Sequence, residues 1–233
     1  MLAPAVPHCE ENAAGDRPFR HDGYVGRHRL AERTDAFHLL FVCTGNICRS
    51  PFAEILTRHL LRGRLGGQVA TAFDVSSAGV AAVVGAGMHP DSRAELGPWG
   101  LDGALADAFV ARQLEPSMIE RSHLVLGATA RHRSAVVELC PAALPIAFGV
   151  REFARLAAAV DPAELPEHPV ARAHALTELA RLRRGLVPPE PEGDDIPDPM
   201  GRPRGIHHRA ASLIHDAVAQ VIDIVSPPTY EAS

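Results

Sequence analysis

The sequence predicts an α/β fold in which a parallel β-sheet is covered by helices on both faces. Short, continuously apolar segments alternate with longer segments of helical periodicity, an order typical of parallel sheets. The first apolar segment leads through a short glycine-containing loop directly into a helix. A hydrophobic share of 46% in 233 residues is sufficient for one packed domain with additions.

The N-terminal region differs from the rest of the chain. Residues 1–36 mix proline, glycine, arginine, histidine and acidic residues without any period. We therefore predict a loosely ordered extension over 1–36 and a folded domain over 37–227. Ordered structure should begin with HLLFVC, residues 38–43, because a continuous apolar run fits a strand buried on both faces.

A helix should follow the loop after this strand. Residues of one helical face recur downstream, at Phe52, Ile55, Leu56, His59 and Leu60. Ser50 followed by Pro51 is a favourable helix start, since proline is tolerated in the first turn. The local pattern is therefore strand, glycine-containing loop, helix.

Three further strands are predicted, at 73–79 (FDVSSAG), 123–129 (HLVLGAT) and 144–150 (LPIAFGV). Short helices should fill 91–122, and residues 131–140 should form another helix. The alternation of strands and helices gives a sheet of four strands with helices on both faces.

Residues 151–193 depart from this alternation. Two helical segments, 151–160 and 169–186, are joined by a proline-rich turn and followed by the stiff linker PPEPEG. We interpret 151–193 as a helical insertion, either packed on the domain edge or acting as a lid over the site. The chain then ends in an amphipathic helix whose apolar face contains Ile206, Ala210, Leu213, Ala217, Val221 and Ile224.

Composition excludes several classes of function. The net charge is −5 and the arginines are scattered among acidic residues, which argues against a nucleic-acid partner. No apolar run reaches about 18 residues and the N-terminus lacks a basic segment before an apolar one, so we expect neither a membrane span nor a signal peptide. We therefore predict no membrane partner.

Cysteine usage indicates a reducing compartment. Four cysteines, Cys9, Cys43, Cys48 and Cys140, are too few for a disulfide scaffold in a chain of this length. Functional thiols in the cytoplasm fit better, so the predicted localisation is cytoplasmic. All the basic residues are arginine, a codon-usage sign of a bacterium with a GC-rich genome.

The chemistry is carried by Cys43 at the strand end and Arg49 six positions later, where the helix starts. Backbone N–H groups at a helix N-terminus converge on one point, and the helix dipole adds positive potential there, so an oxyanion such as phosphate fits. The planar guanidinium of Arg49 can bind two further oxygens. The same field favours the thiolate of Cys43, which is the competent nucleophile. The alternative is a buried structural cysteine at a strand end.

Phosphoryl transfer through cysteine also needs an acid for the leaving oxygen. Asp198 stands between two prolines, which hold the chain stiff and can present a carboxylate at a fixed distance. Asp194 and Asp195 are rivals beside the linker, and a plain Pro-Asp turn is the structural alternative. We predict no metal site and no cofactor, since the adjacent His207 and His208 point apart on a helix and the other histidines show no ligand spacing.

The sequence VCTGNICRSP, residues 42–51, followed by Ala-Glu, resembles the signature of the low-molecular-weight protein-tyrosine phosphatases. SSAG at 76–79, ARQL at 111–114 and the Asp198–Pro199 pair resemble further segments of that family in the same order. The resemblance implies a four-stranded parallel sheet in a flavodoxin-like three-layer fold. It also implies hydrolysis of phosphotyrosine or another aryl phosphate through a phosphocysteine at Cys43, with a phosphorylated protein or small aryl phosphate as partner and inorganic phosphate as product.

Residue roles follow from the same resemblance. Cys43, Arg49 and Asp198 would be catalytic, Asp198 acting first as acid and then as base. The substrate phosphate would be bound by the loop residues Thr44, Gly45, Asn46, Ile47, Cys48, Arg49 and Ser50. Asn46 would hold the loop in shape, and Cys48 matches the family's second loop cysteine, which can form a reversible disulfide with the nucleophile.

Three departures from the family pattern affect the expected cleft. A histidine common before the Ala-Arg pair is absent, because Phe109 and Val110 precede Ala111, so the network around Asn46 should be shorter or water-filled. Aromatic residues that line the cleft in the family are replaced by Met200 and by the region of Val83. A wider, less aromatic cleft should select phosphotyrosine less strictly.

Alternative functions remain open at this point. A relative that hydrolyses phosphoarginine carries threonine where Ile47 stands, so isoleucine favours the aryl phosphate. Arsenate reductase-like thiol chemistry needs a downstream cysteine relay, and Cys140 alone does not provide one. A catalytically weak phosphate-binding module would have no need for Cys43 together with Asp198.

Overall fold

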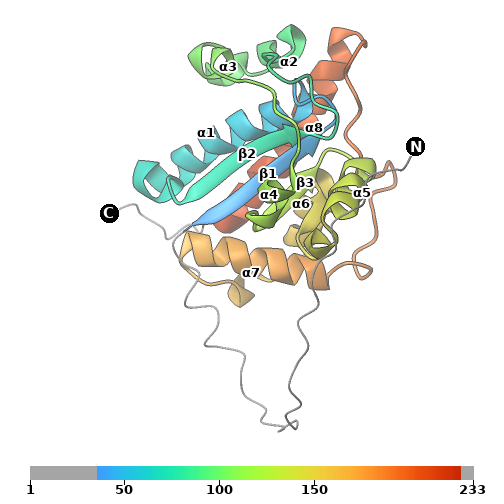
Figure 1. Ribbon diagram of the computed structural model, residues 1–233. Coiled ribbons are helices and arrows are strands. Elements are labelled where there is room, and N and C mark those ends of the chain that lie inside the picture. Colours follow the sequence, from blue (N-terminus) through green and yellow to red (C-terminus); the bar gives the residue numbers. More distant parts are fainter. Residues whose placement is uncertain (1–35, 227–233) are drawn as a thin grey trace, which may run out of the picture. The chain divides into compact units, whose positions relative to one another are not determined.

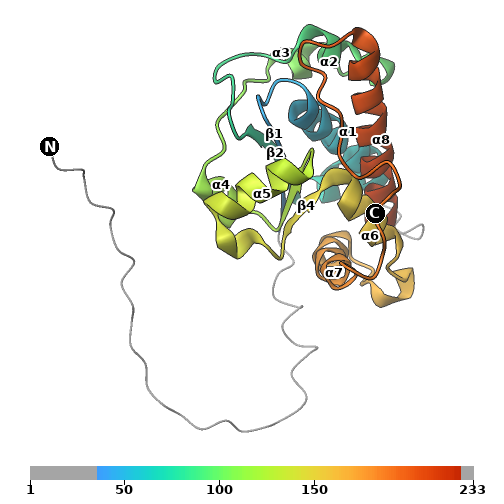
Figure 2. The same cartoon turned by 90° about the vertical axis from the view of Figure 1, so that its right-hand side faces the viewer.

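The computed structural model describes residues 36–226, in which a four-stranded parallel sheet is covered by helices on both faces (Figure 1; Figure 2). The strands are β1 (Phe37–Cys43), β2 (Phe73–Gly79), β3 (Leu124–Gly127) and β4 (Ala147–Gly149). Their order in the sheet is β2-β1-β3-β4, and every neighbouring pair is parallel. The predicted fold class is confirmed. The extension predicted over 1–36 lies outside the described residues except for its last position.

Helices of this part of the chain are α1 (Arg49–Ala70), α2 (Pro90–Ala94), α3 (Ala104–Asp107), α4 (Pro116–Glu120), α5 (Ala130–Leu139), α6 (Val150–Ala158), α7 (Pro169–Leu182) and α8 (Arg204–Val225). Short 3-10 helices lie at Gly97–Trp99, Pro141–Ala143 and Pro162–Glu164. Among the described residues, no helix is long and apolar enough to cross a bilayer.

Alternation along β1 explains the three layers. Leu39 and Phe41 face the cluster formed with α1, α6, α7 and α8, whereas Leu40 and Val42 face a smaller cluster that includes residues of α4 and α5. Successive side chains of a strand point to opposite faces, so a strand that is apolar at every position must be buried on both. The continuous apolar run at 38–43 therefore predicted this arrangement.

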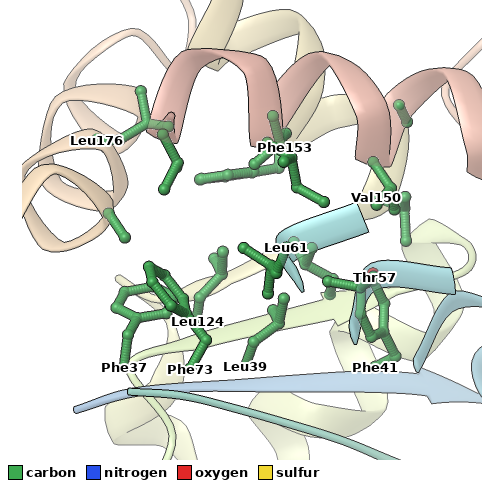
Figure 3. Close-up of a pocket in the computed structure, with 17 residues that line it drawn as sticks. Phe37, Leu39, Phe41, Thr57, Leu61, Phe73, Leu124, Val150, Phe153 and Leu176 are labelled. Atoms are coloured by element: carbon green, nitrogen blue, oxygen red, sulfur yellow. The ribbon is translucent and has the colours of Figure 1, made fainter. Parts of the chain in front are cut away.

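The larger core contains a small apolar cavity of about 40 Å³ between the sheet and the helices above it (Figure 3). Phe37 and Leu39 of β1 line it from the sheet, and Leu176 of α7 closes it from the opposite side. Thr57 of α1 is the one polar residue in its lining. The segment predicted as a helical insertion thus completes, through α7, the hydrophobic core on this face of the sheet.

The fourth strand is shorter than predicted. We expected a strand over 144–150, but β4 covers only Ala147–Gly149, because a 3-10 helix ends at Ala143 and a turn occupies the next three residues. Pro145 within that turn has no N–H to donate to a neighbouring strand, which is consistent with pairing that begins only after it.

α7 does not cover the C-terminal ends of the strands. It packs against α6, α8 and the first residues of β1, where the His174 ring lies 5.0 Å from that of Phe37 and its Nε2 atom lies 3.3 Å from the carbonyl oxygen of Ala36. These residues mark the N-terminal end of β1. The edge-packing interpretation of the insertion therefore fits α7, and the lid interpretation does not.

Candidate active site

The predicted site lies at the C-terminal edge of the sheet. Cys43 is the last residue of β1, residues 44–48 form a loop, and Arg49 begins α1. β1 is an inner strand with β2 and β3 on either side, so loops from three strands meet here. Ligands of open α/β sheets bind at this edge.

Backbone hydrogen bonds turn the loop carbonyls to one side. The oxygens of Cys43, Thr44 and Gly45 accept from the amides of Val80, Ala81 and Val83 at 3.0 Å each. The oxygen of Ile47 likewise accepts from the His89 amide at 2.8 Å. In a trans peptide the N–H points opposite to the carbonyl, so the N–H groups that follow these carbonyls point away from residues 80–89. They form a cradle of donors suited to an oxyanion.

Gly79 permits this close approach. A Cβ atom at Gly79 would lie 2.5 Å from the carbonyl oxygen of Thr44 and 3.0 Å from the amide nitrogen of Asn46. Both neighbours are backbone atoms and cannot rotate out of the way. A glycine at the end of β2 is therefore needed for the loop to lie against this strand.

The sulfur and the guanidinium are both buried. Cys43 Sγ lies 2.9 Å from Ser50 Oγ, whose hydroxyl can donate to a thiolate. Arg49 is 4% exposed, and its Nε is buried without a hydrogen-bond partner. An orphaned buried donor is costly unless a ligand satisfies it, so Arg49 points to a bound anion.

Asn46 holds the loop through a chain of hydrogen bonds. It is the one non-glycine residue of the described chain with positive φ, at 53°, a conformation that asparagine tolerates better than most residues. Its Nδ2 donates to Ser50 Oγ and to Ser77 Oγ, both at 2.9 Å, and its Oδ1 accepts from the Arg112 amide at 2.9 Å.

The network continues to Glu54, which sequence reasoning missed. Ser77 Oγ donates to Glu54 Oε2 at 2.7 Å, and Arg58 pairs with Glu54 Oε1 at 3.0 Å. Burial raises the pKa of Glu54, while Ser77 and the arginines oppose this shift. The expectation of a shorter or water-filled network is therefore wrong, because a buried carboxylate supports the loop without the absent histidine.

Asp198 is brought to Arg49 across 149 positions of sequence. Its Oδ1 lies 3.1 Å from Arg49 Nη2, and Arg49 Nη1 donates to the carbonyl oxygen of Ile196 at 3.2 Å. The Asp198 side chain is 54% exposed, so the carboxylate faces the open side of the site. The ion pair therefore brings the predicted acid next to the predicted phosphate clamp.

The two rival aspartates have other partners. Asp194 Oδ2 pairs with Arg155 Nη2 at 2.7 Å, and Asp195 Oδ1 accepts from the Ala130 amide at 2.7 Å at the start of α5. The amide of Ile196 also donates to the Ala128 carbonyl at 2.9 Å. These contacts hold residues 194–196 in place and leave Asp198 as the acid candidate.

His132 is a second residue that sequence reasoning missed. Its Nε2 lies 3.0 Å from the Thr44 hydroxyl and its Nδ1 lies 2.8 Å from the Thr129 hydroxyl. Burial first, and then the charge of Arg49, lower the pKa of His132 to about 4. A neutral imidazole therefore links the loop to the start of α5. The position of His132 just after a predicted strand was the feature of the sequence that could have indicated its role.

An apolar wall borders the loop. Ile47 Cγ1 and Val83 Cγ2 would lie 3.5 and 3.6 Å from a Cβ on Gly45, so the two side chains flank the same loop residue. Val83, Val84 and Met200 are exposed at 50%, 69% and 49%. The wall is aliphatic, as expected from the missing aromatic residues.

Sequence comparison places the chain among phosphatases. The family described as low molecular weight phosphotyrosine protein phosphatase matches residues 38–160, so residues 151–160 of the expected insertion lie within the match. A protein-arginine-phosphatase of Geobacillus stearothermophilus is 32% identical over 117 residues, which is 50% of this chain and 71% of the relative. A low molecular weight protein-tyrosine-phosphatase of Streptomyces coelicolor is 36% identical over 107 residues, 45% of this chain and 60% of the relative.

Structural comparison gives phosphatases of the same fold. An Erwinia amylovora tyrosine phosphatase aligns with a TM-score of 0.57 at 19% identity, covering 82% of this chain and 95% of that one. The YwlE arginine phosphatase from Geobacillus stearothermophilus aligns with a TM-score of 0.55 at 25% identity, covering 80% and 91%. The likeness at 19% identity shows the shared fold, whereas the family itself rests on the sequence match.

Proposed function

The chain belongs to the low molecular weight phosphotyrosine protein phosphatase family, and we propose that it hydrolyses phosphate monoesters on proteins through a phosphocysteine at Cys43. One observation carries the proposal. Cys43 Sγ lies 2.9 Å from Ser50 Oγ inside a loop whose buried arginine lies 3.1 Å from Asp198. Nucleophile, phosphate clamp and acid are therefore assembled at one strand end.

In the first step, the substrate phosphate replaces Asp198 as the partner of Arg49, and its oxygens accept hydrogen bonds from the loop amides. The Cys43 thiolate attacks phosphorus, so the S–P bond forms as the bond to the leaving oxygen breaks. Asp198, released from Arg49, takes up a proton from solvent as the substrate binds and donates that proton to the leaving oxygen. Fixed donors around the equatorial oxygens stabilise the transition state without reorganisation.

In the second step, Asp198 is a carboxylate and accepts a proton from water. That water attacks phosphorus, the S–P bond breaks, and inorganic phosphate leaves. The Ser50 hydroxyl, at 2.9 Å, stabilises the departing thiolate. Because the cycle needs a free thiolate at Cys43, we infer that the enzyme works in a reducing compartment such as the cytoplasm.

The substrate we propose is phosphotyrosine or another aryl phosphate. The flanking Ile47 and Val83 present apolar surface beside the loop, which suits the face of an aromatic ring. The 32% identity to an arginine phosphatase favours phosphoarginine as the second candidate. A charged guanidinium would gain little from an aliphatic wall, so we rank the aryl phosphate first.

The test compares aryl-phosphate hydrolysis by wild type, Cys43→Ser and Asp198→Ala, without added metal and with a reductant. We expect no activity from Cys43→Ser and a loss of roughly 10²–10⁴-fold from Asp198→Ala, the usual span for a general acid. Asp216→Ala, an exposed aspartate on α8, is the control and should retain full activity. Peptides carrying phosphotyrosine or phosphoarginine then decide between the two substrates.

Three outcomes would contradict the proposal, the last of them only in part. An inactive wild type that still binds vanadate would indicate a phosphate-binding module instead of an enzyme. Thiol-dependent reduction of arsenate that exceeds ester hydrolysis would indicate arsenate reductase-like chemistry. Full activity in Asp198→Ala would remove the assigned acid while leaving Cys43 in place.

A further inference from the structure

Three soft ligand side chains converge beside the phosphate loop. Cys48 is the residue before α1, His89 is the residue before α2, and His207 lies in the first turn of α8. One donor atom from each lies within 4.8 Å of the other two. The three positions are far apart in the sequence, so the cluster is produced by tertiary folding alone.

His207 contains a buried nitrogen that lacks a partner. The residue is 2% exposed, and its Nδ1 lies 2.8 Å from the hydroxyl of Ser92. Its Nε2 is buried and makes no hydrogen bond of acceptable geometry, and the nearby Pro199 backbone acts on the ring as an acceptor. When Nδ1–H donates to the Ser92 hydroxyl, the lone pair of the neutral ring is on Nε2.

His89 completes the pair of imidazoles. The rings of His89 and His207 are stacked, with centroids 4.7 Å apart. His89 Nδ1 accepts from the Asp91 amide at 3.3 Å, beyond the usual range of a good N–H···N or N–H···O bond. Metal binding through Nδ1 would use the lone pair that accepts from Asp91. Binding through Nε2 would put the proton on Nδ1, so this weak bond is lost in both cases, at the cost of one contact at the start of a five-residue helix.

The surroundings suit a cation more than an empty void. Asp91 Oδ2 lies 4.0 Å from His207 Nε2. The negative charge of Asp198 is felt at Cys48, and that of Glu95 is felt at His207. Arg49 is the opposing positive charge. A cavity of about 10 Å³, the size for one water or one ion, is lined by Cys48 and His207 together with Arg49, Ser92 and apolar residues of α8, and His89 lies outside its lining.

We propose that Cys48, His89 and His207 bind one divalent ion of the zinc class. One thiolate with two imidazoles is a donor set that zinc and cobalt prefer and that magnesium and calcium do not. A tetrahedral site with bonds of about 2.0–2.3 Å needs donors about 3.3–3.7 Å apart, so each side chain must move inward by about 1 Å or less.

Ion binding requires the Cys48 thiol to lose its proton. Burial raises the pKa of Cys48 to about 11 in the metal-free protein, where the thiol is neutral. The S–metal bond forms as the S–H bond breaks, and the proton leaves to solvent. Ser92, bonded to His207 Nδ1, orients that ring as the second-shell partners of metal histidines do.

The proposed metal site is distinct from the hydrolytic site. Among the described residues, neither His89 nor His207 forms a hydrogen bond with the Cys43 sulfur. The metal site adjoins the hydrolytic site through Cys48, which belongs to the loop itself. Bound metal would tie the loop to α2 and α8, two elements that are far apart in the sequence. We therefore expect the ion to raise the melting temperature of the protein by mass action.

The experiment uses full-length, untagged protein stripped with a chelator. Co²⁺ is titrated in and followed by its sulfur-to-metal charge-transfer absorption, and Zn²⁺ affinity is measured by competition with a chromophoric chelator. We expect one equivalent per chain, a band that disappears in Cys48→Ser, and strongly weakened binding in His89→Ala and His207→Gln. Ser92→Ala should weaken binding roughly 10–100-fold, the usual effect of a lost second-shell partner.

Cys140→Ser is the matched control, since this thiol lies outside the cluster and should leave band and affinity unchanged. Circular dichroism verifies the fold of each variant; if His207→Gln unfolds, the other three variants decide. A band that survives in Cys48→Ser, or one lost in Cys43→Ser alone, would assign the metal elsewhere and overturn the proposal. Absence of stoichiometric binding by folded wild type would do the same, and would leave the cavity to a water molecule.

Discussion

Asn46 illustrates how much a single residue does in this loop. Its backbone has φ of 53°, and its side chain bonds Ser50, Ser77 and the Arg112 amide. The same amide group therefore fixes the hydroxyl that contacts the Cys43 sulfur and ties β2 to the loop. Residues other than glycine and asparagine would lose both the conformation and the contacts.

His132 stabilises the other side of the loop and makes stability depend on pH. It is buried and neutral between Thr44 and Thr129, with its pKa lowered to about 4 from 6.5. Below pH 6.5 the unfolded chain takes up a proton that the folded protein does not accept until about pH 4. The contribution of this histidine is therefore fully present above pH 6.5 and is lost as the pH falls toward 4.

We predict that wild type loses more stability between pH 7 and pH 5 than His132→Gln does. Glutamine can retain a hydrogen bond to Thr44 and does not titrate, so it removes the proton linkage. Urea unfolding at the two pH values measures the difference in free energy. His59→Gln, an exposed histidine of α1, controls for the loss of one histidine. Equal pH dependence in wild type and His132→Gln would contradict the assignment.

At the scale of elements, α6 positions the acid loop. Arg155 of α6 pairs with Asp194 at 2.7 Å and donates to the Val187 carbonyl at 2.8 Å, while Arg151 donates to the Gly193 carbonyl at 2.6 Å. Both partners of the Arg155–Asp194 pair are largely buried, so this pair is a firmer anchor than the exposed ion pairs of the molecule. The chain leaving the insertion is thus fixed four residues before Asp198.

We predict that Arg155→Ala lowers kcat for aryl-phosphate hydrolysis while phosphate still binds to the loop. Loss of the anchor frees the segment before Asp198, and misplacement of an acid by about 1 Å can cost roughly 10²-fold. Steady-state kinetics with phosphate as competitive inhibitor separates the two effects. Arg181→Ala, which breaks an exposed pair on α7, should change neither value. An unchanged kcat in Arg155→Ala would show that Asp198 is held by other contacts.

In α8 the buried face differs from the one that the pattern of apolar residues predicts. Ala210 and Ala217 are buried as predicted, but Ile206, Leu213, Val221 and Ile224 lie at the border of the buried face. The buried face includes His207 and is rotated toward it, because Ser92 of α2 supplies a hydrogen bond at 2.8 Å. A polar residue with a tertiary partner can therefore be buried where the sequence pattern places solvent.

At the scale of the whole described unit, stability and chemistry are separated along β1. Cys43 and the loop lie at the C-terminal end of the strand, whereas α7 packs at its N-terminal end around Phe37. A strand of seven residues spans about 20 Å, so the two ends do not touch. α7 therefore acts on the core and not directly on the site.

We predict that Leu176→Ala destabilises the protein by roughly 2–5 kcal/mol without changing kcat, the range for a leucine truncated in a core. Leu176 is 1% exposed and lines the cavity in Figure 3, which the truncation would enlarge. Chemical denaturation gives the free energy of unfolding, and kinetics at low temperature gives kcat of the folded enzyme. A changed preference between two aryl phosphates would instead revive the lid interpretation.

The sequence by itself determined the fold class and the centre of the site. Strand, loop and helix are consecutive in the chain, so the apolar run at 38–43 and the Cys43–Arg49 spacing already fix their mutual geometry. Burial on both faces of a parallel strand leaves a continuous apolar signature, and this is why β1 was located correctly. The short β4 carried a weaker signal, because only three of its seven predicted residues pair.

Only the tertiary structure decided which distant side chains meet. The flanking prolines favoured Asp198 over Asp194 and Asp195, but the partners that separate the three are Arg49, Arg155 and the start of α5, which lie far away in the chain. The same holds for Glu54 under Asn46, His132 against Thr44, and His207 beside Cys48. Local periodicity reports which face of an element is apolar. It contains no information on which polar group from another element will lie opposite a buried one, because that depends on how the layers pack.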